Sequence, residues 1–216
     1  MPSRPGKPKP KSKPASGGKE LRLDAPIRII GGELKNKKLL YSGEDVTRPM
    51  KERVRASVFN LVGPSIKGKH AIDLFAGTGA LGIEALSRGA VSATFIERHI
   101  PTSRLVRQNL DNLGLGERSQ LFAANTFFWA KRLPKFDDTP WVVFCSPPYE
   151  LFISQADDML TLISTLLAAA PLESVFVVES DQRFDFASLP HAAAWDVREY
   201  PPAVVGILRD WSELAS

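Results

Sequence analysis

The sequence has little of what a secreted, membrane or metal-binding protein needs. It contains one cysteine, Cys145, so no disulfide can form within the chain. No apolar run approaches the roughly 20 residues that span a bilayer, and the basic N-terminal segment lacks the apolar stretch of a secretory signal. His70, His99 and His191 show no metal-ligand spacing. We therefore expect a cytoplasmic protein that uses no metal ion and binds no membrane.

The composition favours one ordinary domain preceded by a basic tail. The chain has 216 residues, of which 44% are hydrophobic, and this is enough for a proper core. Much of the net charge of +4 lies in residues 1–19, which hold six basic residues, five prolines and no acid. We expect residues 1–24 to be disordered. Such a tail either attracts phosphates or serves only for solubility.

A turn with Gly77 and Gly79 lies between a predicted short buried strand, which opens with Ala71 and Ile72, and a predicted helix. This geometry lets a ligand approach the backbone N–H groups at a helix N-terminus. Asp73 lies four residues before Gly77 and distinguishes the turn from a dinucleotide loop, because a carboxylate repels pyrophosphate. It suits an ammonium, such as that of the amino-acid end of S-adenosylmethionine. A plain structural turn is the alternative.

Polar residues also follow the next two predicted strands. Glu97 ends the strand at 93–96, where a βαβ unit places an acceptor for ribose hydroxyls. Asn125 follows the strand at 120–124 and would contact the adenine. An ordinary strand end and a turn-forming asparagine are the alternatives. The predicted cofactor-binding residues are Asp73, Phe75, Ala76, Gly77, Gly79, Glu97, Arg98 and Asn125.

A second specific signal follows the apolar run at 141–145. Two prolines cannot continue a sheet ladder, so the chain leaves the strand in a fixed, extended turn. The exocyclic amine of a nucleobase is a poor nucleophile because its lone pair is delocalised into the ring. Acceptors at the Ser146 hydroxyl and the Pro147 carbonyl would direct that lone pair toward a methyl donor, and Tyr149 would stack on the base. The predicted catalytic residues are Ser146, Pro147, Pro148 and Tyr149.

Strands alternate with helices across residues 70–180, which predicts a parallel sheet with helices on both faces and a closing hairpin near the C-terminus. An N-terminal hairpin is predicted to turn at Gly31 and Gly32, and a helix capped by Thr47 follows it. A basic face on this helix would contact RNA, or it is simply solvated. The predicted RNA-contacting residues are Arg28, Arg48, Lys51, Arg53 and Arg55. We therefore expect an RNA-contacting segment at 25–65 and a catalytic domain at 66–216.

Several segments between residues 27 and 152 form a recognisable set: Ile29-Ile30-Gly31-Gly32, Thr47-Arg48-Pro49, Arg53-Val54-Arg55, Phe59-Asn60 and the run from Asp73 to Ala90. Their sequence and order resemble those of the RsmD-type 16S rRNA guanine-N2 methyltransferases. The resemblance implies a class I, Rossmann-like methyltransferase fold and S-adenosylmethionine as the donor. It also implies a guanine of 16S rRNA, naked or in a small-subunit assembly intermediate, as the acceptor. We expect a monomer.

Two positions depart from the pattern of that family. The family usually has Asp or Asn where this chain has Ser146, and Asp where it has Asn125. Serine is a shorter and neutral acceptor, and it also occurs in methyltransferases that act on cytosine N4 in DNA. A DNA amino methyltransferase is therefore one alternative, although so short a chain has no separate target-recognition domain. A catalytically weakened RNA-binding protein is the other.

Overall fold

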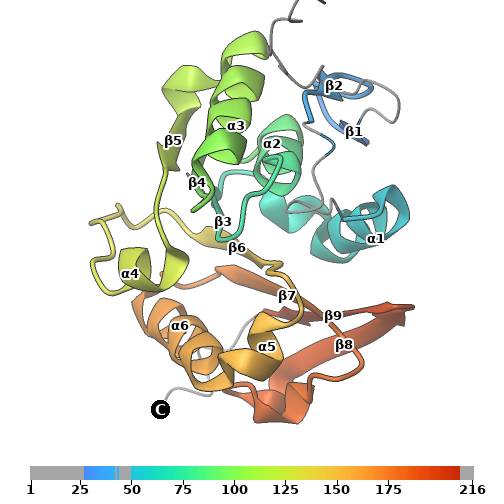
Figure 1. Ribbon diagram of the computed structural model, residues 1–216, viewed down its shortest axis with the longest axis vertical. Coiled ribbons are helices and arrows are strands. Elements are labelled where there is room, and N and C mark those ends of the chain that lie inside the picture. Colours follow the sequence, from blue (N-terminus) through green and yellow to red (C-terminus); the bar gives the residue numbers. More distant parts are fainter. Residues whose placement is uncertain (1–26, 42, 44–49, 210–216) are drawn as a thin grey trace, which may run out of the picture.

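The computed structural model describes residues 27–41, 43 and 50–209. The predicted tail at 1–24 and the predicted helix cap, Thr47, lie outside the described residues. The centre of the described part is a seven-stranded sheet with the order β5-β4-β3-β6-β7-β9-β8 (Figure 1). Its strands are β3 (His70–Asp73), β4 (Ser92–Ile96), β5 (Ser119–Phe122), β6 (Trp141–Cys145), β7 (Val175–Asp181), β8 (Trp195–Tyr200) and β9 (Ala203–Leu208).

The sheet is parallel from β5 to β7, and β9 enters antiparallel between β7 and β8. The predicted parallel sheet and closing hairpin are thereby confirmed. The helices are α1 (Glu52–Val62), α2 (Ala80–Ser87), α3 (Ile100–Asn112), α4 (Thr126–Ala130), α5 (Leu151–Ser154) and α6 (Ala156–Ala169). Short 3-10 helices cover Gly63–Ile66, Gly116–Arg118, Phe186–Ser188 and Ala192–Ala194.

Two apolar cores lie on opposite faces of the sheet. Side chains alternate along the central strand β6, because successive residues of a strand point to opposite faces. Val142 and Phe144 join the core under α1, α2 and α3, whereas Trp141, Val143 and Cys145 join the core under α4, α5 and α6. Figure 1 shows these helices on either side of the sheet. A strand buried on both faces explains the nearly continuous apolar run in its sequence.

The N-terminal hairpin pairs β1 (Ile27–Arg28) with β2 (Lys38–Leu39), as the sequence predicted. Its loop lies against the end of α2 (Figure 1). Gly32 has a φ of 77°, and a Cβ atom there would lie 1.8 Å from the carbonyl oxygen of Ser87. Glycine is therefore required at this contact.

Glu84 of α2 holds the same loop from inside the core. Its side chain is fully buried, and its two carboxylate oxygens accept the N–H groups of Ile30 and Gly31, both at 2.7 Å. Arg88, one turn later, forms an ion pair with it at 2.8 Å. A buried carboxylate is tolerated here because both of its oxygens are hydrogen-bonded and its charge is balanced.

Candidate active site

Polar residues converge at one edge of the sheet because the carboxyl ends of parallel strands lie together. Asp73 is the last residue of β3, Glu97 directly follows β4, and Ser146 directly follows β6. Glu179 lies near the end of β7. The sheet order makes β3 the neighbour of both β4 and β6, so these side chains surround the middle of the edge.

Asp73 is almost completely buried, with 1% of its surface exposed. Burial raises its pKa to about 7; the hydrogen bond from the Gly82 N–H to Oδ2, at 3.0 Å, opposes this rise, and the nearby charge of Glu97 adds to it. The carboxylate therefore anchors the first turn of α2. It also changes its charge near neutral pH.

The turn between β3 and α2 uses two glycines in the left-handed region, Gly77 with a φ of 54° and Gly79 with a φ of 78°. Glu97 closes the turn from the neighbouring strand. Its Oε2 accepts the Gly77 N–H at 2.8 Å, and its Oε1 accepts the His99 N–H at 2.7 Å. The structure thus brings Asp73, Gly77, Gly79 and Glu97 together around one loop.

Asn125 takes the position of a helix cap. Its Oδ1 accepts the N–H groups of Phe127 at 2.9 Å and of Phe128 at 3.3 Å, at the start of α4. The side-chain oxygen of Asn125 therefore has a local structural role, as in the turn-forming alternative. Phe75 packs edge-on against Phe127, with ring centroids 6.3 Å apart, and so connects this cap to the glycine loop.

The remaining residues predicted to bind the cofactor flank this loop. Ala76 is buried, and its N–H donates to the Ile96 carbonyl at 2.9 Å, which ties the loop to β4. Arg98 is exposed beside Glu97.

The Ser146 to Tyr149 turn is held by a residue that sequence reasoning missed. The Ser146 hydroxyl donates to Oε2 of Glu179, and the Tyr149 hydroxyl donates to Oε1 at 2.6 Å. Glu179 is 4% exposed, and burial raises the pKa of its carboxyl while these two hydrogen bonds oppose the rise. Pro147 is buried and Pro148 is exposed. The available signal was an acidic residue directly after the apolar run of β7.

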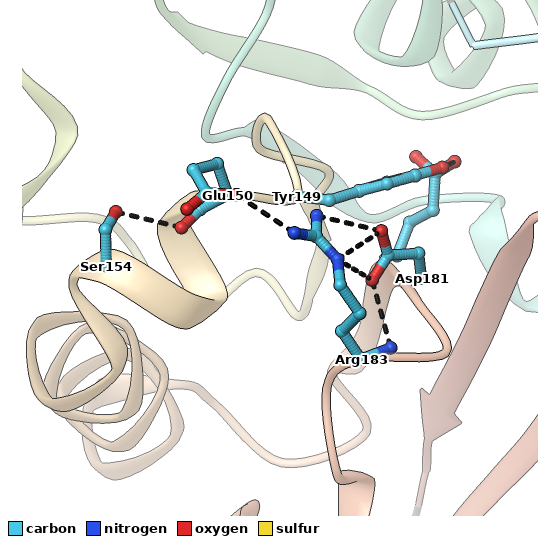
Figure 2. A network of polar contacts seen from close by, with 6 residues as sticks. Tyr149, Glu150, Ser154, Asp181 and Arg183 are labelled. Carbon is cyan, nitrogen blue, oxygen red and sulfur yellow. Dashed lines mark hydrogen bonds and ion pairs between the residues drawn. The ribbon is translucent and has the colours of Figure 1, made fainter.

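A second polar network supports the outer side of the same turn. Arg183 donates to the carboxylate of Glu150 at 3.0 Å and pairs with that of Asp181 at 3.0 Å. Figure 2 shows its guanidinium between these two carboxylates, with the Tyr149 side chain alongside. The network joins the turn after β6 to the end of β7.

The predicted RNA-contacting residues that the structure describes do not all lie on one exposed face. Lys51 and Arg53 are exposed, but the exposed Arg28 already forms an ion pair with Glu52 at 2.8 Å. The prediction for Arg55 is wrong. This side chain is 2% exposed and donates to the carbonyl oxygen of Arg28, because it lies on the side of α1 that packs into the core.

Three further points concern these RNA-contacting predictions. Burial lowers the pKa of Arg55, while the carboxylates of Glu84 and Glu52 act to raise it. Arg48 lies outside the described residues. The helix α1 begins at Glu52, later than the sequence predicted.

Two general properties can be stated for the part of the chain that the structure describes. None of its helices combines the length and the apolar character that crossing a bilayer requires. Within residues 27–41, 43 and 50–209, no group of three or more His, Cys, Asp or Glu side chains is arranged to hold a metal ion.

Comparisons with known proteins give the same fold. A family profile described as Conserved hypothetical protein 95 matches residues 27–200. Ribosomal RNA small subunit methyltransferase D of Escherichia coli is 39% identical over 124 residues, which is 57% of this chain and 60% of that protein. The match therefore spans less than two thirds of this relative's length.

Two solved structures extend the comparison. The structure of yhhF from Escherichia coli is 29% identical with a TM-score of 0.67, and the match covers 84% of this chain and 96% of that one. The 16S rRNA N2 methyltransferase RsmC of T. thermophilus, in complex with AdoMet and guanosine, gives a TM-score of 0.65 at 16% identity. That match covers 86% of this chain and 49% of RsmC, and it supports the fold alone. The chain thus has the class I, Rossmann-like methyltransferase fold.

Proposed function

The chain belongs to the family described as Conserved hypothetical protein 95, and on this premise we propose that it methylates the exocyclic N2 amine of a guanine in 16S rRNA, with S-adenosylmethionine as the donor. The observation that carries the proposal is the position of the Ser146 to Tyr149 turn next to the loop between Asp73 and Gly79, at one edge of the sheet. The name of the Escherichia coli relative supports the substrate class.

The residues around the glycine loop fit S-adenosylmethionine. That molecule supplies a methyl group activated by a sulfonium, and its amino-acid end carries an ammonium. Asp73 is a buried carboxylate that forms no ion pair with any residue the structure describes, and such a group is stabilised when an ammonium binds beside it. Glu97, which directly follows β4, would accept the ribose hydroxyls. Phe75, Ala76, Gly77, Gly79, Arg98 and Asn125 complete the proposed set.

The turn after β6 fits the acceptor amine. Ser146 Oγ and the Pro147 carbonyl oxygen would accept the two amine hydrogens and orient the nitrogen lone pair toward the methyl group. Tyr149 would stack on the extruded base, a contact worth about 1–3 kcal/mol. Pro148 restricts the turn that presents these groups. The rest of the rate enhancement would come from holding two reactants in line, which can contribute several kcal/mol.

The RNA would approach over the N-terminal segment at 25–65. Lys51 and Arg53 are exposed at the start of α1, and Arg28 lies on the hairpin beside them. We propose that these residues, with Arg48 and the basic tail, neutralise phosphates. The protein would act in the cytoplasm as a monomer on 16S rRNA or a small-subunit assembly intermediate. Arg55 is no longer part of this set.

The test is transfer of labelled methyl from S-adenosylmethionine to small ribosomal subunits and to naked 16S rRNA, both from cells that lack this protein. We expect label in N2-methylguanosine, identified by mass spectrometry, and none with Asp73→Ala. Label in DNA as N6-methyladenine or N4-methylcytosine would favour the DNA methyltransferase instead. No transfer with intact cofactor binding would favour the weakened RNA-binding protein.

A further inference from the structure

Glu179 has no role in the function proposed above, yet it touches both polar side chains of the Ser146 to Tyr149 turn. We propose that Glu179 is the positioning residue of the amine site: its carboxylate takes the Ser146 hydroxyl proton as a hydrogen bond and so leaves the Ser146 oxygen as an acceptor only. This inference rests on the proposed methyl transfer and deepens it.

The argument begins with the chemistry of a serine hydroxyl. It carries one proton and two lone pairs, so it can donate or accept. An unconstrained serine could donate to a ring atom of the base and leave the amine unoriented. Because the Ser146 proton points to Glu179 Oε2, the lone pairs of Oγ are left for the amine. A neutral serine then performs the acceptor role for which the RsmD-type methyltransferases usually have Asp or Asn.

The same carboxylate fixes the aromatic ring. Its other oxygen accepts the Tyr149 hydroxyl at 2.6 Å, so one buried group sets the positions of both the acceptor and the stacking residue. The outer network of Arg183, Glu150 and Asp181 holds the following residues of the turn (Figure 2). Tyr149 is thus anchored from the inside by Glu179, while its neighbour Glu150 is anchored at the surface.

Proton balance gives Glu179 a second task. When the amine nitrogen bonds to the methyl group, the C–S bond breaks and its electron pair stays on sulfur. The nitrogen then carries one proton too many. That proton passes to Ser146 Oγ while the Ser146 proton passes to Glu179 Oε2. The products are a neutral methylated amine, an unchanged serine and a neutral carboxylic acid, which later loses its proton to water.

The surroundings of Glu179 favour this task. Burial raises the pKa of its carboxyl, which makes the carboxylate a better proton acceptor. Its titratable neighbours are Tyr149 and the buried thiol of Cys145, whose own pKa is raised by burial and by Glu179. On β9 the residue opposite is the apolar Val205. Within the described part of the chain, no lysine or arginine forms an ion pair with Glu179.

The experiment compares Glu179→Gln with Glu150→Gln, a matched change at an exposed carboxylate of the same turn. We expect Glu179→Gln to lower kcat about 100-fold or more, as for loss of a general base. The KM for RNA and the Kd for S-adenosylmethionine should stay within about threefold. The kcat of the wild type should fall at low pH, because protonation of Glu179 removes the proton acceptor. This fall should disappear with Glu179→Gln and persist with Glu150→Gln.

A measurement without turnover accompanies the kinetics. Melting temperatures of both variants and the wild type are taken from pH 4 to 8. The folded pKa of Glu179 is raised, so its contribution to stability is present below the unfolded pKa, near the ordinary value of 4.5, and is lost as pH rises. Glu179→Gln should therefore gain stability relative to the wild type as pH rises. Glu150→Gln should show no such trend.

Three results would overturn the assignment: an unchanged kcat in Glu179→Gln, a loss confined to KM, or a melting difference that does not vary with pH. If Glu179→Gln does not fold, Ser146→Ala and Ser146→Thr test the same relay. Alanine should lose the rate to the same extent, and threonine, which keeps the hydroxyl, should retain most of it; equal rates would refute the relay. A wild type that methylates no RNA overturns the proposed function itself, whereas an active wild type with a fully active Glu179→Gln overturns only the role of Glu179.

Discussion

The affinity for S-adenosylmethionine should depend on pH through Asp73. The carboxyl is buried and its pKa is about 7 before the ligand binds. An ammonium placed within about 4–6 Å would lower that pKa by about 1–3 units, so the ligand would bind the ionised form. Asp73 is ionised in about half of the molecules at pH 7 and in about one tenth at pH 6. The affinity should therefore fall about fivefold between these two values.

Isothermal titration calorimetry measures both the affinity and the protons released. At pH 7 we expect about half a proton per ligand, found from titrations in buffers of different ionisation enthalpy. The range from pH 6 to 7 lies below the ordinary pKa of an α-amino group, about 7.7–8.0, so the ligand stays an ammonium. Asp73→Asn keeps an acceptor for the Gly82 N–H but loses the charge. It should bind about 10- to 100-fold more weakly, as for the loss of a hydrogen bond to a charged group.

The reasoning fails if Asp73→Asn shows the same pH dependence as the wild type. It also fails if the wild type releases no proton at pH 7. His99→Gln is the control for a nearby imidazole: the backbone N–H of His99 donates to Glu97, and its ring Nδ1 lies 2.8 Å from the Thr102 hydroxyl oxygen. The His99→Gln variant should retain the pH dependence of the affinity for S-adenosylmethionine. If that dependence is lost in His99→Gln, the assignment to Asp73 is refuted.

Two further predictions, tested with four substitutions, address the N-terminal segment. Glu84→Gln breaks a buried, hydrogen-bonded ion pair and should lower the free energy of unfolding in urea by about 3–5 kcal/mol. The control is Glu33→Gln, in an exposed pair with Arg118, which should lower it by about 1 kcal/mol or less. Equal losses in the two variants would contradict the role of Glu84 in holding the hairpin loop against α2. Lys51→Gln and Arg53→Gln should each reduce the slope of log K against log salt for RNA binding by about 0.7–0.9, and unchanged slopes would remove these residues from the interface.

The sheet could be predicted because its strands are short apolar runs separated by amphipathic helices and glycine turns. The convergence of Asp73, Glu97 and Ser146 could be predicted for the same reason, since the carboxyl ends of parallel strands share one edge. These are consequences of topology. They need no knowledge of how individual side chains pack.

Arg55 and Glu179 could not be assigned because packing decides their environment. Helical spacing places Arg55 beside Lys51, but the rotation of α1 against the sheet turns Arg55 inward and leaves Lys51 exposed. Glu179 lies 33 residues after Ser146, and the contact depends on the register of β6 against β7. Neither the rotation of a helix nor the register of a strand pair is fixed by a periodic pattern alone.

The helix α2 joins the two ends of the proposed reaction. Its first turn carries the Gly82 N–H that binds Asp73, and its last turn carries Ser87, which accepts the Leu34 N–H at 2.9 Å and donates to the Gly31 carbonyl at 2.6 Å. A helix of eight residues is about 12 Å long and stiff on this scale. The hairpin that would hold the RNA is therefore kept at a fixed distance from the loop that would hold the methyl donor. In-line transfer requires this because a displacement of about 1 Å between the reactants costs about 100-fold in rate.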